Sequence, residues 1–258
     1  MLELRGIEIG QGGGVRNVRA GDILGLCRKI LQKCKPEHLH GNILLRMPDA
    51  MDAKVSKLVD KAKLAQDRLV KSGYTKLSSK KKTAELVEAG IVNLVKQEVP
   101  RSSSAWCYKC HCACAVAGAA EEAAQTFRLT MHVAGFCCWD WSSRGKNQGW
   151  CGGITNVFIE WLKVRVESQE DFIIAECTRR FKQDIIAKSL PSYEVQSAVF
   201  SPLQMGFGVN RYRIYILCLR KARLRWVAPL DLLGMLEKLF FRRSILPGSV
   251  SNMKSYRI

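Results

Sequence analysis

The sequence lacks the two apolar features that mark membrane and secreted proteins. It has no run of about 18 apolar residues, the length that a membrane-spanning helix needs. Its opening stretch, MLELRGIEIGQGGG, contains no apolar core of the kind that secretory signal peptides carry. We therefore expect an intracellular protein, nuclear if the source is a eukaryote. In such a reducing compartment the eleven cysteines, an odd number, are expected to be free thiols rather than disulfides.

Acidic residues are also scarce. Lys and Arg number 41 against 23 for Asp and Glu, which gives a formal charge of +18. This excess favours a nucleic acid partner over a membrane; a basic but unspecialised surface is the alternative. The stretch 195–230 has no acidic residue at all. It holds a cluster of cations that we predict to contact phosphates: Arg220, Lys221, Arg223 and Arg225.

Composition divides the chain into four regions. Residues 1–100 are basic and are expected to be mostly helical, with helices at 22–34, 51–70 and 83–95. Residues 101–126 form a cysteine-rich junction that follows the linker-like PRSSS stretch. Residues 127–220 have the pattern of an α/β core, and residues 221–258 that of a basic C-terminal helix and tail.

Strand-like and helix-like patterns alternate within the third region. Short apolar runs predict strands, and apolar residues at helical spacing predict the helices between them. The expected strands are 129–134, 172–175, 195–200 and 213–219, and the expected helices are 153–164 and 179–189. This alternation is typical of an α/β protein built on a doubly wound sheet.

The junction contains a dense group of cysteines in the stretch WCYKCHCAC, which begins at Trp106. Cysteine and histidine are the ligands that zinc prefers, and CxxCH also matches a c-type haem attachment pattern. However, the sequence has no second CxxC, and four ligands drawn only from Cys107 to Cys114 would strain a tetrahedral site. We expect reduced thiols here and no bound metal, with a zinc-dependent interaction module as the alternative.

The stretch from Gly135 to Gly149, GFCCWDWSSRGKNQG, combines an expected strand end, two adjacent thiols and a glycine-bordered loop. It resembles the catalytic loop of the cytosine-5 DNA methyltransferases, whose pattern is roughly G-x-P-C-Q-x-F-S-x-x-G. Cys138, Ser142 and Gly145 fall on matching positions, and Cys137 replaces the family proline.

Two further motifs follow in family order. The stretch Ala175 to Thr178 resembles the family's E-N-V motif and keeps its glutamate, Glu176. The stretch GFGVNRYRIYI resembles the family's G-x-P-Q-x-R-x-R-x-Y motif and keeps Arg211 and Arg213. The resemblance implies a Rossmann-like fold that uses S-adenosylmethionine, possibly incomplete, with the helical N-terminal region attached.

The resemblance also implies a chemistry. Cys138 would add to carbon 6 of a flipped cytosine, and carbon 5 would then accept the methyl group. Glu176 and Arg213 would act with it as catalytic residues, while Arg211, Ser142 and Gly145 would bind the substrate. Either cysteine of the adjacent pair can be the nucleophile on pattern alone, and register with Ser142 and Gly145 favours Cys138 over Cys137.

The methyl-donor site is not apparent. A glycine-rich stretch at 10–14 is a candidate loop for S-adenosylmethionine, but it lacks the family's aromatic residue, so the cofactor-binding residues stay unassigned. Three alternatives remain: a catalytically inactive nucleic-acid-binding module on the same fold, a tRNA cytosine-5 methyltransferase, and a chain that needs a partner to supply missing elements.

Overall fold

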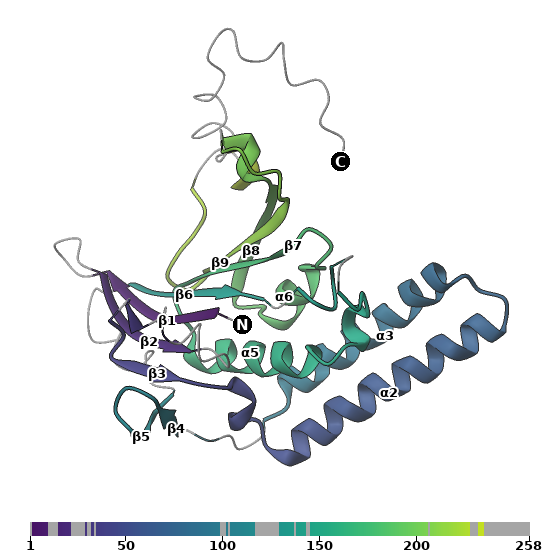
Figure 1. Ribbon diagram of the computed structural model, residues 1–258, viewed down its shortest axis with the longest axis horizontal. Helices are drawn as coiled ribbons and strands as arrows, with labels where there is room; N and C mark the ends of the chain where they lie inside the picture. Colours follow the sequence, from purple (N-terminus) through teal and green to yellow (C-terminus); the bar gives the residue numbers. More distant parts are fainter. Residues whose placement is uncertain are drawn as a thin grey trace, which may run out of the picture.

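The computed structural model of the 258-residue chain describes residues 2–9, 15–21, 29, 32–33, 35–98, 102, 104–116, 129–136, 138–142, 145–205, 207–227 and 232–234. They form a mixed α/β fold in which the sheet has the strand order β5-β4-β3-β2-β1-β6-β7-β9-β8. The described helices lie against one face of this sheet (Figure 1).

The strands occupy the following ranges: β1 (Leu2–Ile9), β2 (Val15–Gly21), β3 (His38–His40), β4 (Ser104–Cys107), β5 (Cys112–Ala115), β6 (Leu129–Gly135), β7 (Phe172–Thr178), β8 (Tyr193–Phe200) and β9 (Arg213–Arg220). The α-helices are α2 (Asp49–Lys71), α3 (Lys76–Lys96), α5 (Thr155–Ser168) and α6 (Asp184–Ser189). Three short 3-10 helices are η1 (Ile43–Arg46), η2 (Gly149–Cys151) and η3 (Pro202–Met205).

The alternation expected between residues 129 and 220 is confirmed. β6 and β7 are parallel neighbours joined through α5, as a strand–helix–strand unit requires. β9, however, lies between β7 and β8 and runs antiparallel to both. Among the described residues, α5 and α6 both lie on one face of the part of the sheet formed by β6, β7, β9 and β8, so the doubly wound arrangement is not seen there.

The helix expected at 179–189 is shorter than predicted. Residue Thr178 ends β7, and its hydroxyl accepts a hydrogen bond from the Arg180 amide at 3.2 Å. The Thr178 carbonyl accepts another from the Phe181 amide at 2.9 Å, which closes a tight turn. This turn directs Phe181 into the core, so α6 begins only at Asp184.

The N-terminal region contributes strands as well as helices, which corrects the expectation of a mostly helical region at 1–100. β1 pairs antiparallel with both β2 and β6, so these residues extend the same sheet. The junction at 101–126 likewise contains an antiparallel hairpin, β4–β5. The predicted helix at 22–34 and the predicted C-terminal helix lie almost entirely outside the described residues.

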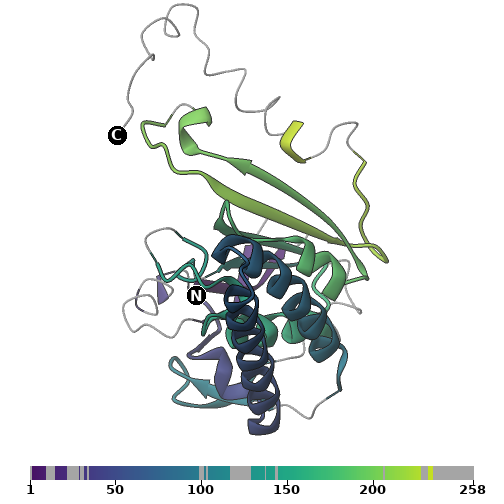
Figure 2. The same cartoon turned by 90° about the vertical axis from the view of Figure 1, so that its right-hand side faces the viewer.

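The helices α2 and α3 form an antiparallel hairpin inserted between β3 and β4 (Figures 1 and 2). A buried stripe on α2, made of Met51, Val55, Val59 and Ala62, packs at helical spacing toward the core. α3 begins seven residues earlier than the sequence predicts a helix, because the Thr75 hydroxyl caps it by accepting from the Ser78 amide at 3.2 Å. Among the described residues, none of these helices is long and apolar enough to cross a membrane.

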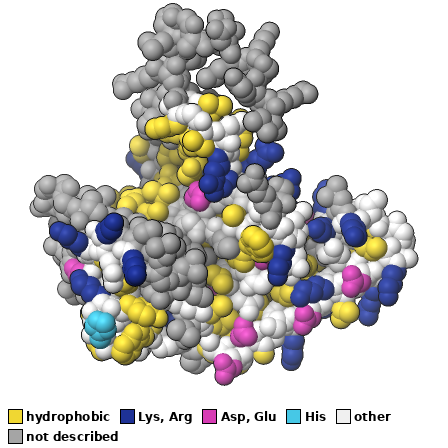
Figure 3. Space-filling model, viewed as in Figure 1, with side chains coloured by type: hydrophobic (Ala, Val, Ile, Leu, Met, Phe, Trp, Pro, Cys, Tyr) yellow, Lys and Arg dark blue, Asp and Glu magenta, His cyan; other side chains and the backbone are white. Residues whose placement is uncertain are grey.

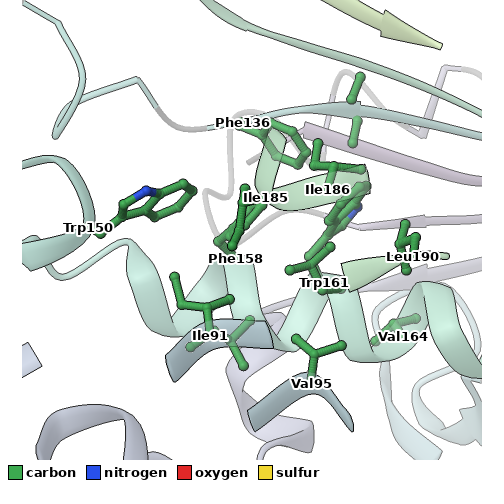
Figure 4. Close-up of a cluster of buried hydrophobic side chains, with 14 of the residues drawn as sticks. Ile91, Val95, Phe136, Trp150, Phe158, Trp161, Val164, Ile185, Ile186 and Leu190 are labelled. Atoms are coloured by element: carbon green, nitrogen blue, oxygen red, sulfur yellow. The ribbon is translucent and has the colours of Figure 1, made fainter. Parts of the chain in front are cut away.

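The hydrophobic core lies between the sheet and the helices, and aromatic rings fill its centre (Figure 4). Phe136, from the end of β6, meets Trp161 of α5 edge to face, with ring centroids 4.7 Å apart. Alternate residues of β7, such as Ala175 and Cys177, face this core. The residues between them, including Glu176, therefore point to the opposite face of the sheet.

A buried ion pair ties the end of α5 to the start of β7. Arg165 Nη1 lies 2.9 Å from Glu170 Oε1, and neither side chain is more than 4 % exposed. Replacing Glu170 with Ala removes this carboxylate from a buried guanidinium, so we expect a loss of about 3–5 kcal/mol in the free energy of unfolding. Guanidinium titration measures it, with Asp67→Ala on the exposed side of α2 as the control. Equal losses in the two variants would contradict the prediction.

Candidate active site

The loop that carries Cys138 begins where β6 ends. The Cys138 carbonyl accepts hydrogen bonds from the Trp141 amide at 3.0 Å and the Ser142 amide at 2.8 Å. These bonds fold residues 138–142 into a single tight turn, with Cys138 half-buried against the core. The competing thiol, Cys137, lies outside the described residues.

Gly145 closes the turn. A Cβ atom at this position would lie 1.9 Å from the Trp139 carbonyl oxygen and 2.9 Å from the Ser142 hydroxyl. The backbone therefore approaches more closely than any side chain permits, and the Gly145 amide donates to the Ser142 carbonyl at 3.2 Å. Of the residues predicted to bind substrate, Ser142 and Gly145 thus lie together in the loop of Cys138.

Asp140 anchors this loop to α5, a role that the sequence reasoning missed. Its buried carboxylate accepts a hydrogen bond from the Ile154 amide at 3.2 Å, at the amino-terminal end of the helix. A negative charge is favourable there because the helix dipole is positive at that end. The carboxylate packs so closely that a Cβ at Gly152 would lie 1.9 Å from it.

Aromatic contacts hold the other side of the loop. The Trp141 ring meets Trp150 with centroids 4.6 Å apart and Phe181 with centroids 5.5 Å apart, both edge to face. Such pairs are worth about 0.5–1.5 kcal/mol each beyond burial. Because Phe136 also packs on Phe181, the segments before and after Cys138 are fixed to the same core.

Glu176 and Arg213 meet directly. Arg213 Nε lies 2.7 Å from Glu176 Oε1, and the two side chains are 19 % and 37 % exposed. β7 and β9 are antiparallel with Glu176 opposite Tyr215, so Arg213 is the diagonal neighbour on the same face. The pair is accessible and charge-assisted, which leaves it able to exchange partners with a polar ligand.

The Glu176–Arg213 pair lies beside the end of β6, where the Cys138 loop begins. Glu176 is opposite Gly135 in the parallel ladder, and its carbonyl accepts a hydrogen bond from the Phe136 amide at 2.8 Å. The buried thiol of Cys177 lies close enough to these residues for their charges to affect its pKa. Burial raises the pKa of Cys177 to about 12, and the charges of Glu176, Cys138 and Arg213 all act on it.

Two other described thiols near this region, those of Cys218 and Cys151, have pKa values raised by burial. Burial alone raises the pKa of Cys218 to about 12. Burial also raises the pKa of Cys151, although Lys63 and Lys80 oppose the effect. Thiols held protonated in this way are poor nucleophiles.

Arg211 does not pair with Glu176. It precedes β9, its side chain is exposed, and its amide donates to the Ser201 hydroxyl at 2.8 Å. Its charge still reaches Tyr215: burial and Glu176 raise the pKa of this tyrosine, while Arg213 and Arg211 lower it. The structure therefore places Arg211 at the rim of the Glu176–Arg213 pair.

The cations predicted to bind nucleic acid lie at the other end of β9. Arg220 donates to the Gln169 side chain at 2.6 Å, and Arg223 pairs with Asp171 at 3.3 Å. Lys221 donates to the Pro191 carbonyl at 3.0 Å, and Arg225 is exposed. Since β9 runs from Arg213 to Arg220, about 23 Å of strand separates this group from the Glu176–Arg213 pair. The structure does not bring the two groups together.

A different basic surface borders the Cys138 loop. A cavity of about 670 Å³ lies between the α2–α3 hairpin and the loop, with Trp141 and Trp150 among its lining residues. Its lining has no acidic residue and includes four cations, Lys80, Lys81, Arg180 and Lys182. Figure 3 shows further Lys and Arg side chains over α2 and α3, with Asp and Glu interspersed. No local pattern in the sequence indicated that cations of the helix and of the loop would lie around one cavity.

Comparisons with known proteins found weak similarity among solved structures. No protein-family model matches the chain, and no curated protein matches it. Among solved structures, the crystal structure of S. pombe Dnmt2 methyltransferase is similar with 21% sequence identity and a TM-score of 0.26. The similarity covers 30% of this chain and 27% of that protein's chain, so it spans little more than a quarter of the length of that protein.

Proposed function

We propose that this chain carries the base-attacking half of a cytosine-5 methyltransferase site, with DNA as the favoured substrate. The observation that carries the proposal is the accessible Glu176–Arg213 pair at 2.7 Å, set beside the strand end that leads into the Cys138 loop. The carboxyl ends of β6 and β7 and the amino end of β9, which lead into or carry the three motifs, lie at the same end of the sheet.

The first step is the addition of the Cys138 thiolate to carbon 6 of cytosine. A carbon–sulfur bond forms, and the electron pair of the carbon 5–carbon 6 double bond moves toward ring nitrogen 3. Carbon 5 thereby becomes nucleophilic. Because carbon 6 is inaccessible within a duplex, the base must first be flipped out, at a cost of a few kcal/mol. The cation-lined cavity beside the loop supplies phosphate contacts that offset this cost.

Glu176 and Arg213 stabilise the charge that develops on the ring. One Glu176 oxygen accepts a hydrogen bond from the exocyclic amine, and the other, once protonated, donates to ring nitrogen 3. Arg213 Nε holds the carboxyl group in place through the 2.7 Å contact. Fixed groups of this kind act without reorganisation during the reaction, which is the main source of their catalytic effect.

The strand that leads to the candidate S-adenosylmethionine loop ends far from Cys138. The candidate glycine loop at 10–14 lies outside the described residues, but the strand before it is placed. β1 is antiparallel to β6, and Ile9 pairs with Leu129 at the start of β6, whereas Cys138 follows its end. The loop therefore begins about 20 Å from Gly135. We assign no donor-binding residue, and propose that the donor site is formed elsewhere or by a partner chain.

The proposal predicts covalent capture of a base without any methyl donor. We expect a duplex oligonucleotide containing 5-azacytosine to form an adduct that survives denaturing electrophoresis, because the ring nitrogen at position 5 makes carbon 6 more electrophilic. The adduct should be absent with Cys138→Ser and retained with Cys137→Ser and with Cys151→Ser, a control in the same loop region.

The result also separates the competing functions. Binding of the duplex with no adduct in any variant would favour the inactive nucleic-acid-binding module. An adduct confined to a structured RNA carrying the same base would favour a tRNA substrate. Loss of the adduct in Cys137→Ser, with retention in Cys138→Ser, would overturn the assignment of the nucleophile.

A further inference from the structure

Four potential metal ligands converge at the edge of the sheet, far from the Cys138 loop. The ligand atoms of His38, Cys107, Cys110 and Cys114 all lie within 4.8 Å of one another. His38 belongs to β3, Cys107 to β4 and Cys114 to β5, and Cys110 occupies the turn of the β4–β5 hairpin (Figure 1). The histidine is the distant ligand that the sequence pattern alone did not reveal.

The spacing suits a tetrahedral ion. With zinc–sulfur bonds of about 2.3 Å and zinc–nitrogen bonds of about 2.0–2.1 Å, sulfur and nitrogen ligands are about 3.6 Å apart and two sulfurs about 3.8 Å apart. The observed distance from Cys110 Sγ to His38 Nδ1 is 3.6 Å. The ligands are therefore already near the positions that they would occupy around zinc.

The backbone around Cys107 is arranged to stabilise a thiolate. The Leu39 amide donates to Cys107 Sγ at 3.3 Å, and the Cys110 amide donates to it at 3.4 Å. Thiolates are the form in which cysteine binds metal.

The hairpin turn is also held in a fixed shape against β3. His111 adopts a left-handed conformation with φ of 56°, which lets the chain reverse directly after Cys110. The Tyr108 amide donates to the Leu39 carbonyl at 2.7 Å, and Lys109 Nζ donates to the Pro36 carbonyl at 2.6 Å. Both contacts join the CxxC turn to the strand that carries His38.

We propose that His38, Cys107, Cys110 and Cys114 bind one Zn²⁺ ion that has a structural role. Three thiolates and one imidazole are a ligand set that selects zinc by softness and geometry. Four protein ligands fill the coordination sphere and leave no open position for a substrate, so the site does not activate water. Binding releases the thiol protons to solvent.

The ion would stabilise the place where the α2–α3 hairpin joins the sheet. This hairpin leaves the sheet after β3 and returns at β4, yet the ladder between these two strands has a single residue pair, His40 with Cys107. A metal ion bound by both His38 and the β4–β5 hairpin would add a second link between β3 and β4, stronger than this single pair. The basic helices beside the Cys138 loop would thereby be held in register with the sheet.

Metal analysis of the full-length chain tests the site without reference to any activity. We expect about one zinc per chain by mass spectrometry after purification without chelator. After exchange into Co²⁺, we expect the visible spectrum of a tetrahedral site and an intense sulfur-to-cobalt charge-transfer band. Cys110→Ser should lose most of the metal and weaken the band per bound cobalt. Cys112→Ser, the same change two residues away at a position outside the four ligands, should keep both.

The outcomes are decisive in either direction. A wild-type chain that contains no metal and gives no charge-transfer band with Co²⁺ would overturn the proposal, whatever the variants do. Equal metal loss in Cys110→Ser and Cys112→Ser would overturn the ligand set. The Co²⁺ spectrum of the wild-type chain needs no substitution, so it holds even where Cys110→Ser fails to fold.

Discussion

Replacing Glu176 with alanine is expected to slow the exchange of the cytosine carbon 5 hydrogen with solvent by about 10²–10³-fold. In the proposed mechanism, reversible addition of Cys138 to carbon 6 makes carbon 5 basic enough to take up a solvent proton, and reversal then releases the original one. The proposal assigns Glu176 the stabilisation of the ring in this addition, so its loss is expected to raise the barrier by about 3–4 kcal/mol. Release of tritium from cytosine labelled at carbon 5 measures the rate and needs no methyl donor.

Two controls isolate this effect. Glu194→Ala changes a glutamate of β8 that bonds to the Gln196 side chain and the Trp226 amide, so the exchange rate should stay unchanged. Arg213→Ala should slow exchange as well, but should add little in the Glu176→Ala background, because Arg213 acts by positioning that carboxyl group. Independent, multiplicative losses would refute the coupling, and an unchanged rate in Glu176→Ala would refute its catalytic role.

Gly145→Ala is expected to reduce the rate of adduct formation with 5-azacytosine by about 10²-fold while the protein remains folded. The new Cβ would lie 1.9 Å from a backbone atom, the Trp139 carbonyl oxygen, so the turn that carries Cys138 must move. A displacement of about 1 Å at a reacting group is enough for such a loss. Pre-steady-state gel assays measure the rate, and circular dichroism confirms the fold.

The chain provides a matched control for this change. Gly153 lies eight residues further on, at the start of α5, and a Cβ added there meets nothing within 4 Å. Gly153→Ala should therefore leave the rate within about twofold of the wild type. If Gly145→Ala reacts as fast as Gly153→Ala, the close approach of Gly145 to the Trp139 carbonyl does not affect the reactivity of Cys138.

The elements with a clear local pattern of apolar residues were predicted correctly from the sequence. The apolar run at 172–175 and the alternating pattern at 213–219 became β7 and β9, and the stripe on 51–70 became α2. The order of the motifs in the sequence predicted that Glu176 and Arg213 act together. In the structure, Arg213 Nε lies 2.7 Å from Glu176 Oε1. Each of these signals lies within a short window of sequence.

What the sequence did not reveal depends on long-range pairing. The antiparallel direction of β9 arises from the ladder that it forms with β7 and β8, which no local pattern encodes. His38 joins Cys110 across 72 residues, so the cysteine cluster appeared to lack a distant ligand. Asp140 anchors its own loop only because the start of α5 folds back beside it.

The segment that follows β9 crosses the sheet face from which Glu176 and Arg213 project. The Trp226 amide donates to the Glu194 carboxylate at 3.4 Å, and the Leu232 amide donates to the Gln196 side chain at 3.0 Å. Both acceptors belong to β8 and lie on the same face as Glu176. Any molecule that extended from Glu176 and Arg213 along this face toward β8 would therefore meet the backbone of that segment.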